Sequence, residues 1–133
     1  MAQQFYSPLQ LNSTLTVGVN DTGHDVKFFG DTSDKFMVWD ASADVLKLTD
    51  NTPLYIGTGA DLRIYHDGSN SYIDETGDGG LYIKSSAIRL QSEGGENMIY
   101  CVNDGAVNLY HNNVKKFETY AAGAGVTGNM YLT

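Results

Sequence analysis

The sequence repeats one strand-turn-strand pattern three times, and this repetition constrains the fold more than any other feature. The copies begin at Gly23, Gly59 and Gly105, and each enters an alternating run that ends in an aromatic residue. Each run breaks at Gly or His followed by Asp or Asn, and a second aromatic run follows the break. The second runs occupy residues 35–39, 71–73 and 116–120. Two alternating runs joined by turn residues are typical of a β-hairpin, so the pattern predicts three hairpins.

Shorter strand-like segments lie between the hairpins. Residues 15–18, 54–57 and 81–84 share one pattern, a Leu followed two positions later by Val or Ile. Further predicted strands are residues 46–48, 88–90, 98–102 and 130–132. Clusters of Gly, Asn, Asp and Glu separate these segments and predict turns. The apolar residues show no sustained 3.6-residue period, so we expect almost no helix, at most one turn at residues 40–44.

The composition agrees with a chain of short strands and tight turns. The sequence has 15 Gly and 9 Tyr but only 2 Pro. Tyr favours pleated surfaces, and Gly favours turns. We therefore predict an all-β fold of short repeated strand-turn-strand units. The pattern suits a small β-sandwich, a β-prism and an intertwined trimeric β-structure equally well, because periodicity does not separate a core face from a subunit interface.

The first 13 residues match no repeat, and we predict that they form an extended N-terminal arm. The arm contains four apolar residues that we predict to bind a partner, namely Phe5, Tyr6, Leu9 and Leu11, and Pro8 interrupts them. Residues 14–133 are predicted to form a single β-rich repeat domain, which fits the length of the chain. Two turn clusters are predicted to be exposed loops available for contact. One contains Asp67, Gly68 and Asn70, and the other contains Gly77 and Asp78.

The charge of the chain argues against two classes of partner. Eight basic and sixteen acidic residues give a net charge of −8. Such a chain repels phosphate backbones and anionic membrane surfaces, so we expect neither nucleic acid nor membrane as a partner. The single Cys101 excludes an intramolecular disulfide framework. No signal peptide and no apolar run of membrane-spanning length is visible, so we expect synthesis and assembly in a cytoplasm.

The sequence contains no motif that predicts catalysis or cofactor binding. Gly57 and Gly59 begin like a dinucleotide fingerprint, but Leu62 occupies the position of the third Gly. Cys101 and His111 lie on separate predicted strands with no third group, which argues against a nucleophile and its base. We therefore predict that the chain is not an enzyme and has no cofactor.

Metal binding is also not predicted. His66 and His111 lie at the breaks of repeat hairpins, which explains them as turn residues, and with His24 they form no H-x-H pattern. The acidic cluster at residues 74–79 lacks the ligand spacing of a calcium loop, so we interpret it as a solvated turn.

The repeat units predict self-assembly. An isolated hairpin is marginally stable in water, so such units must stack on neighbours or on the same unit of another chain. A trimer whose chains turn their apolar faces toward a common axis would cover those faces and protect strand edges. The number of chains does not follow from the residues alone.

Two long stretches resemble structural proteins of tailed bacteriophages, especially marine ones. The first runs from residue 15 to 57 and includes Thr-Gly-His-Asp-Val-Lys-Phe-Phe-Gly at 22–30 and Met-Val-Trp-Asp at 37–40. The second runs from residue 61 to 128 and includes Ile-Tyr-His-Asp-Gly-Ser-Asn-Ser-Tyr-Ile at 64–73 and Lys-Lys-Phe-Glu-Thr at 115–119. These segments are similar to modules repeated along phage tail-fibre-like proteins and cover most of the chain.

The resemblance implies a homotrimeric virion component that is assembled in the host cytoplasm. The chain holds few modules and no distinct terminal adhesin, and its apolar arm suits a capsid decoration or cement protein. In that reading the arm lies on the major capsid protein or another virion protein, and the β body projects outward. The alternative is a short tail-fibre or receptor-binding module whose exposed loops touch host surface glycans.

Overall fold

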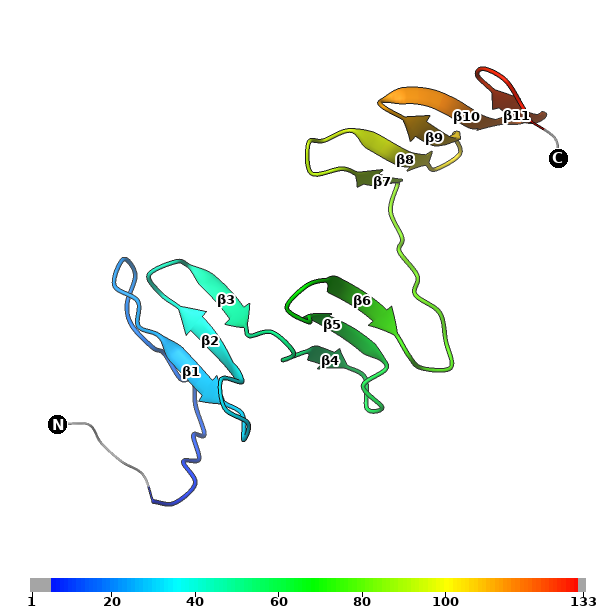
Figure 1. The fold of residues 1–133 in the computed structure, drawn as a ribbon. Helices are drawn as coiled ribbons and strands as arrows, with labels where there is room; N and C mark the ends of the chain where they lie inside the picture. The colour runs from blue at the N-terminus through cyan, green and yellow to red at the C-terminus, as the bar shows by residue number, and fades with distance from the viewer. Residues whose placement is uncertain (1–5, 132–133) are drawn as a thin grey trace. The chain divides into compact units, whose positions relative to one another are not determined.

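The structure is a computed structural model that describes residues 6–131. These residues form eleven β-strands and no helix, and the strands are arranged in three antiparallel sheets (Figure 1). Every pairing joins strands that follow one another in the sequence. The predicted all-β fold of short strand-turn-strand units is therefore confirmed. No helix in residues 6–131 is long and apolar enough to cross a membrane.

The chain divides into two units at the bond between Leu81 and Tyr82. The first unit contains two three-stranded sheets, and the second contains one five-stranded sheet. The assignment of residues 14–133 to a single domain remains a prediction.

The first sheet contains the first repeat hairpin and one further strand. Its strands are β1 (Val26–Phe29), β2 (Phe36–Asp40) and β3 (Val45–Leu48), in that order. Phe29 pairs with Phe36 next to the first turn, and their rings pack edge to face with centroids 6.1 Å apart. Edge-to-face packing is a preferred geometry for aromatic pairs and stabilises the hairpin.

The second sheet has the same size and strand order. Its strands are β4 (Leu54–Ile56), β5 (Leu62–His66) and β6 (Ser71–Glu75). The link from the first sheet is anchored to this one, because the backbone N–H of Asn51 donates to the carbonyl of His66 at 2.8 Å. The side chain of Asn51 also donates to the carbonyl of Asp67 at 3.2 Å.

The third sheet is a five-stranded meander. Its strands are β7 (Ala87–Gln91), β8 (Asn97–Val102), β9 (Val107–His111), β10 (Val114–Tyr120) and β11 (Gly123–Val126). The predicted third hairpin is β9–β10, and a bulge interrupts its register between Lys115 and Phe117. β11 was not predicted, because Gly-Ala-Gly shows no strand pattern. A Cβ atom at Gly125 would lie 2.8 Å from the ring of Tyr120, so a larger residue there would require that exposed ring to move.

Three predicted strands are wrong as far as the structure describes them. Residues 15–18 and 81–84 belong to no strand, and residues 130–131 also form none. Leu132 lies outside the described residues. The corresponding segment of the second sheet does form β4, so the shared Leu-x-(Val/Ile) pattern is compatible with a strand but does not supply the pairing partner.

The described residues bury very few side chains. Val38 on β2, 5% exposed, is the only apolar side chain buried in residues 6–131, and Asn108 on β9, 8% exposed, is the only buried polar one. The Asn108 side-chain amide donates to the carbonyl of Tyr100 at 3.4 Å. A fold of this kind depends on its turns and strand pairs more than on a core.

The tight turns use residues that tolerate positive φ. Asn112 and Asn113 join β9 to β10 with φ values of 55° and 59°, which defines a two-residue turn of the type that matches strand twist. Asp44 and Asp104 adopt positive φ in two other hairpins. Asn and Asp reach this region more easily than other non-Gly residues.

We expect Asn112→Ala to destabilise the β9–β10 hairpin by about 1 kcal/mol, because Ala pays the steric cost of positive φ. Asn112→Gly is the matched control and should leave the free energy of unfolding within about 0.5 kcal/mol of the wild type. Urea denaturation followed by circular dichroism measures both. Equal destabilisation by the two substitutions would contradict this account of the turn.

Candidate functional site

Each sheet has one face made almost entirely of apolar side chains, which we call its apolar face. In an antiparallel sheet, directly paired residues lie on the same face and neighbours along a strand lie on opposite faces. The apolar face of the first sheet consists of Val26, Phe28, Met37, Trp39, Leu46 and Leu48. The apolar part of that face in the second sheet consists of Leu54, Ile56, Leu62, Ile64 and Ile73, with Glu75 at one end and His66 and Ser71 at the other. That of the third consists of Ile88, Leu90, Ile99, Cys101, Val107, Leu109, Phe117 and Val126.

The apolar faces are largely uncovered. Phe28, Leu46 and Ile73 expose about three-fifths of their surface, at 59%, 60% and 64%. Eleven of the side chains on the three faces are exposed by between 38% and 64%. Contiguous exposed apolar surface of this kind marks an interaction site. The three faces are therefore the largest candidate site in the described residues.

The ion pairs lie on the opposite faces. Arg63 on β5 pairs with Asp74 on β6 at 2.5 Å, and Lys115 pairs with Glu118 on β10. Hydrogen bonds from the Lys115 ammonium and then from the Tyr120 hydroxyl lower the pKa of Glu118. Charge is thus kept off the apolar faces, apart from Glu75 at one end of the second sheet.

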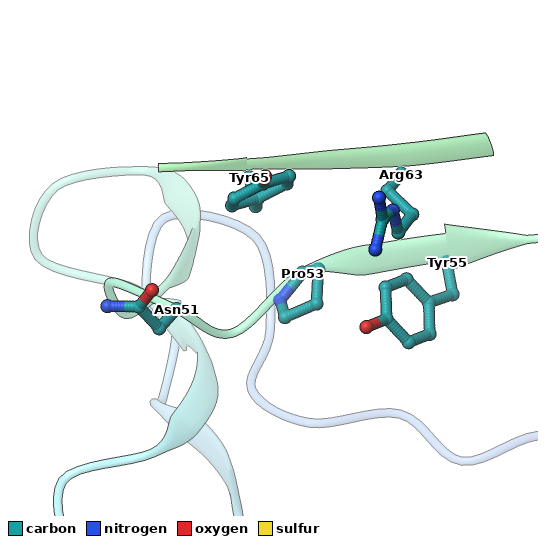
Figure 2. A pocket seen from close by; sticks show the side chains of 5 residues that line it. All are labelled: Asn51, Pro53, Tyr55, Arg63 and Tyr65. Carbon is teal, nitrogen blue, oxygen red and sulfur yellow. The ribbon is translucent and has the colours of Figure 1, made fainter. Parts of the chain in front are cut away.

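A second candidate site is a hollow of about 220 Å³ on the other face of the second sheet (Figure 2). It is lined by Asn51, Pro53, Tyr55, Arg63 and Tyr65. The register places Tyr55 directly opposite Arg63, and Tyr65 follows two residues later on the same face. Figure 2 shows Tyr65 and Arg63 along one strand, with Tyr55 on the neighbouring strand close to Arg63.

Arg63 is incompletely satisfied in this hollow. Its Nη2 donates to Asp74, but its Nε is buried and has no hydrogen-bond partner within the described structure. A buried donor without an acceptor is costly, and such a donor can be satisfied by a bound group. Two tyrosine rings, an amide and an unsatisfied guanidinium N–H suit a ligand with an apolar surface and hydroxyl or carbonyl oxygens.

The sequence did not identify these hollow residues. Tyr55, Arg63 and Tyr65 occupy same-face positions of two consecutive predicted strands, which is the signal that could have found them. Using that signal requires the pairing register of β4 and β5, and the register depends on the five-residue loop between them.

The predicted loop at residues 67–70 is a rigid turn between β5 and β6. The Asp67 carboxylate accepts hydrogen bonds from the backbone N–H groups of Ser69 at 2.8 Å and Asn70 at 2.7 Å. Its other oxygen accepts the hydroxyl of Tyr72 at 2.9 Å. Gly68 adopts a φ of 98°, which favours Gly. Gly68 and Asn70 are exposed, whereas Asp67 is half-buried beneath the turn.

The second predicted loop follows β6. The backbone N–H of Gly77 donates to the Glu75 carboxylate at 2.9 Å, and Gly77 is half-buried against Asp61, while Asp78 is exposed. The structure leaves the proposed contact role of both loops as a prediction.

The predicted arm residues are exposed where they are described. Tyr6, Leu9 and Leu11 belong to no strand and expose at least half of their surface. Phe5 lies outside the described residues. The partner-binding role of these four residues remains a prediction.

The titratable residues considered in the sequence are dispersed. His66 ends β5, where its Nδ1 lies 3.1 Å from the Ser71 hydroxyl, and His111 ends β9. Cys101 is half-buried on the third apolar face and pairs with Val107, four positions from His111 along β9. No group of three His, Cys, Asp or Glu side chains in residues 6–131 is arranged to hold a metal ion.

Comparisons of the chain with protein-family models, with curated proteins and with solved structures found no match.

We expect the Asp67 carboxyl group to titrate with a pKa of about 2 instead of 3.8, because two backbone N–H groups and then the Tyr72 hydroxyl stabilise its ionised form. This contribution to hairpin stability is complete above pH about 3.8 and is lost as the pH falls through about 2. Tyr72→Phe removes one hydrogen-bond donor to the Asp67 carboxylate, so it should raise the pKa of Asp67. A ¹³C NMR titration of the Asp67 carboxyl carbon measures both values, and a midpoint near 3.8 in the wild type would refute the turn geometry.

Proposed function

We propose that this chain is a non-enzymatic structural protein of a tailed-phage virion, and that it forms a homotrimer by joining the apolar faces of its sheets. The observation that carries the proposal is the contrast between three apolar faces and Val38, the one apolar side chain that residues 6–131 bury. A small sheet is stable only when one of its faces packs against another layer. In this chain, the missing layer must come from outside each sheet.

Copies of the chain are the partner that best fits all three faces. Because the copies are identical, each apolar face of one copy has an equivalent face of the same size in every other copy. The exposed side chains of the three faces together offer each copy apolar surface to bury, and a stable interface buries roughly 800 Å² per partner. In this arrangement the ion pairs of the opposite faces stay in water.

The proposed location is the outer surface of a capsid. This step follows from the resemblance to phage virion modules and from the apolar arm, whose Tyr6, Leu9 and Leu11 are exposed and unlike any repeat. The arm docks on the major capsid protein or another virion protein, and the trimeric β body projects outward. Assembly takes place in the host cytoplasm, with no nucleic acid or membrane as a direct partner.

The alternative function is a short tail-fibre or receptor-binding module that contacts host surface glycans. The hollow beside Arg63 favours this alternative, because a sugar combines an apolar face for the rings of Tyr55 and Tyr65 with oxygen acceptors for the unsatisfied Nε. In the capsid role the N-terminal arm makes the external contact, whereas in the receptor-binding role the hollow beside Arg63 makes it.

Light scattering of the purified chain should give the mass of a trimer. Leu46→Lys places an unpaired charge on the first apolar face and should weaken assembly at least about a hundredfold. Val45→Lys is the matched control, because Val45 is the exposed neighbour on β3 that lies on the opposite face. It should remain trimeric. A monomeric wild type, or equal dissociation by both variants, would contradict assembly through the apolar face.

A chain that begins at Thr14 should keep the trimer mass and lose binding to capsids that lack the protein. Sedimentation with such capsids measures the binding, and the full-length chain is the positive control. If the shortened chain instead binds host cells, and Arg63→Gln abolishes that binding, the receptor-binding alternative replaces the capsid role. Capsid binding that survives loss of the arm would disprove the role of the arm.

A further inference from the structure

The tripeptide Leu-Tyr-Ile occurs twice in the chain, with different outcomes. Residues 54–56 form β4 and pair with β5, whereas residues 81–83 form no strand. We infer that residues 81–83 of one copy add to the free edge of β7 in a second copy, as a sixth strand of its five-stranded sheet. This inference rests on the proposed self-assembly and names the backbone contact that joins the copies.

The acceptor strand carries the same sequence pattern as the known partner of β4. β4 pairs with Leu62, Arg63 and Ile64 of β5. β7 contains Ile-Arg-Leu at residues 88–90, which places an arginine between two aliphatic residues in the same way. Applying the register of β4 and β5 pairs Leu81 with Leu90 and Ile83 with Ile88, and it places Tyr82 opposite Arg89.

This register also places the apolar side chains of the added strand on the apolar face of the third sheet. Ile88 and Leu90 belong to the apolar face of the third sheet, so Leu81 and Ile83 would extend that face. Tyr82 would lie on the opposite face beside Arg89. The Arg89 guanidinium carbon already lies 4.1 Å from the centre of the Tyr100 ring. A second ring on its other side is a favourable position for a cation.

Both the donor segment and the acceptor edge are available. Leu81, Tyr82 and Ile83 are exposed by 46%, 84% and 64%, and no hydrogen bond involves residues 81–84 in the described structure. β7 is the outermost strand of its sheet and pairs only with β8. An unpaired edge strand is a template for a strand from another chain.

The chain cannot easily supply this strand to its own β7, because the intervening link lacks turn residues. The loop between β4 and β5 reverses direction with Gly57 at a φ of 97° and Ala60 at 57°. The corresponding link is Lys84-Ser85-Ser86-Ala87, which contains no Gly, Asn or Asp. Short hairpin loops require positive φ, and these residues adopt it only at a steric cost.

The link is also held at its far end. The Ser86 carbonyl accepts a hydrogen bond from the backbone N–H of Asn103 at 2.8 Å, and Ala87 already pairs with Val102. Only Lys84 and Ser85 are therefore left to reverse the chain. An extended link instead carries the Leu-Tyr-Ile segment away from its own sheet edge and toward another copy.

The resulting contact is head to tail. Each copy donates residues 81–83 and accepts the same segment at β7, so the donor and acceptor surfaces differ. Contacts of this kind close into a ring when the rotation between copies permits it. A closed ring leaves no copy with an open β7 edge, which agrees with the proposed trimer.

Disulfide trapping tests both the pairing and its register. The full-length chain would carry Cys101→Ala with Leu81→Cys and Leu90→Cys, two positions that face each other in the inferred pairing. Paired positions on adjacent antiparallel strands lie close enough for a disulfide. Mild oxidation should shift the chain from monomer to covalent dimer and trimer bands on a denaturing gel. The matched control combines Leu81→Cys with Arg89→Cys, whose side chains point to opposite faces, and it should stay monomeric.

A second variant tests why the strand leaves its own chain. Replacing residues 84–87 with Gly-Thr-Gly-Ala-Asp, the loop of residues 57–61, should allow an in-chain hairpin and convert the covalent oligomers into an internally bridged monomer. Internal bridging with the native link, or equal cross-linking of the control pair, would overturn the inference. A trimer by light scattering that shows no cross-link refutes the strand exchange alone. A monomer by light scattering refutes the proposed assembly as well.

Discussion

The constraint on which the structure depends is the need to cover one face of each small sheet. Strand pairing fixes which side chains share a face, and it gives each of the three sheets one mainly apolar face. Val38 is the only apolar side chain that the described residues bury. The hydrophobic contribution that normally stabilises a domain of this length is therefore available only when a further layer packs against these faces.

Turn chemistry decides which strands find a partner within the chain. Positive-φ residues close the tight hairpins, as Asn112 and Asn113 do between β9 and β10. The same Leu-Tyr-Ile sequence pairs where Gly57 follows it and stays unpaired where Lys84 follows it. The residues that follow such a strand thus influence whether its backbone groups find a partner within the chain.

The sequence predicted which neighbouring strands pair, but it did not predict the contacts that depend on the register of those pairs. The three hairpins follow from alternation and turn residues, which act over a few positions. β11 escaped prediction because its Gly-Ala-Gly sequence shows no strand pattern, and only its pairing register with β10 identifies it as a strand. The hollow beside Arg63 escaped for the same reason. The exposed loop residues Gly68 and Asp78 could be placed at turns, but their partners depend on surfaces outside the chain.

In the proposed assembly, repulsion between acidic copies opposes the burial of their apolar faces. The outcome depends on which faces of the sheets carry the charges. Each copy carries a charge of −8, so copies repel at long range. That repulsion is screened beyond about 8 Å at physiological ionic strength. The ion pairs, such as Arg63 with Asp74, lie on the faces that stay in water, so joining the apolar faces desolvates few charges. Burial of the apolar faces would act against this screened repulsion, so a strongly acidic chain is compatible with the proposed self-association.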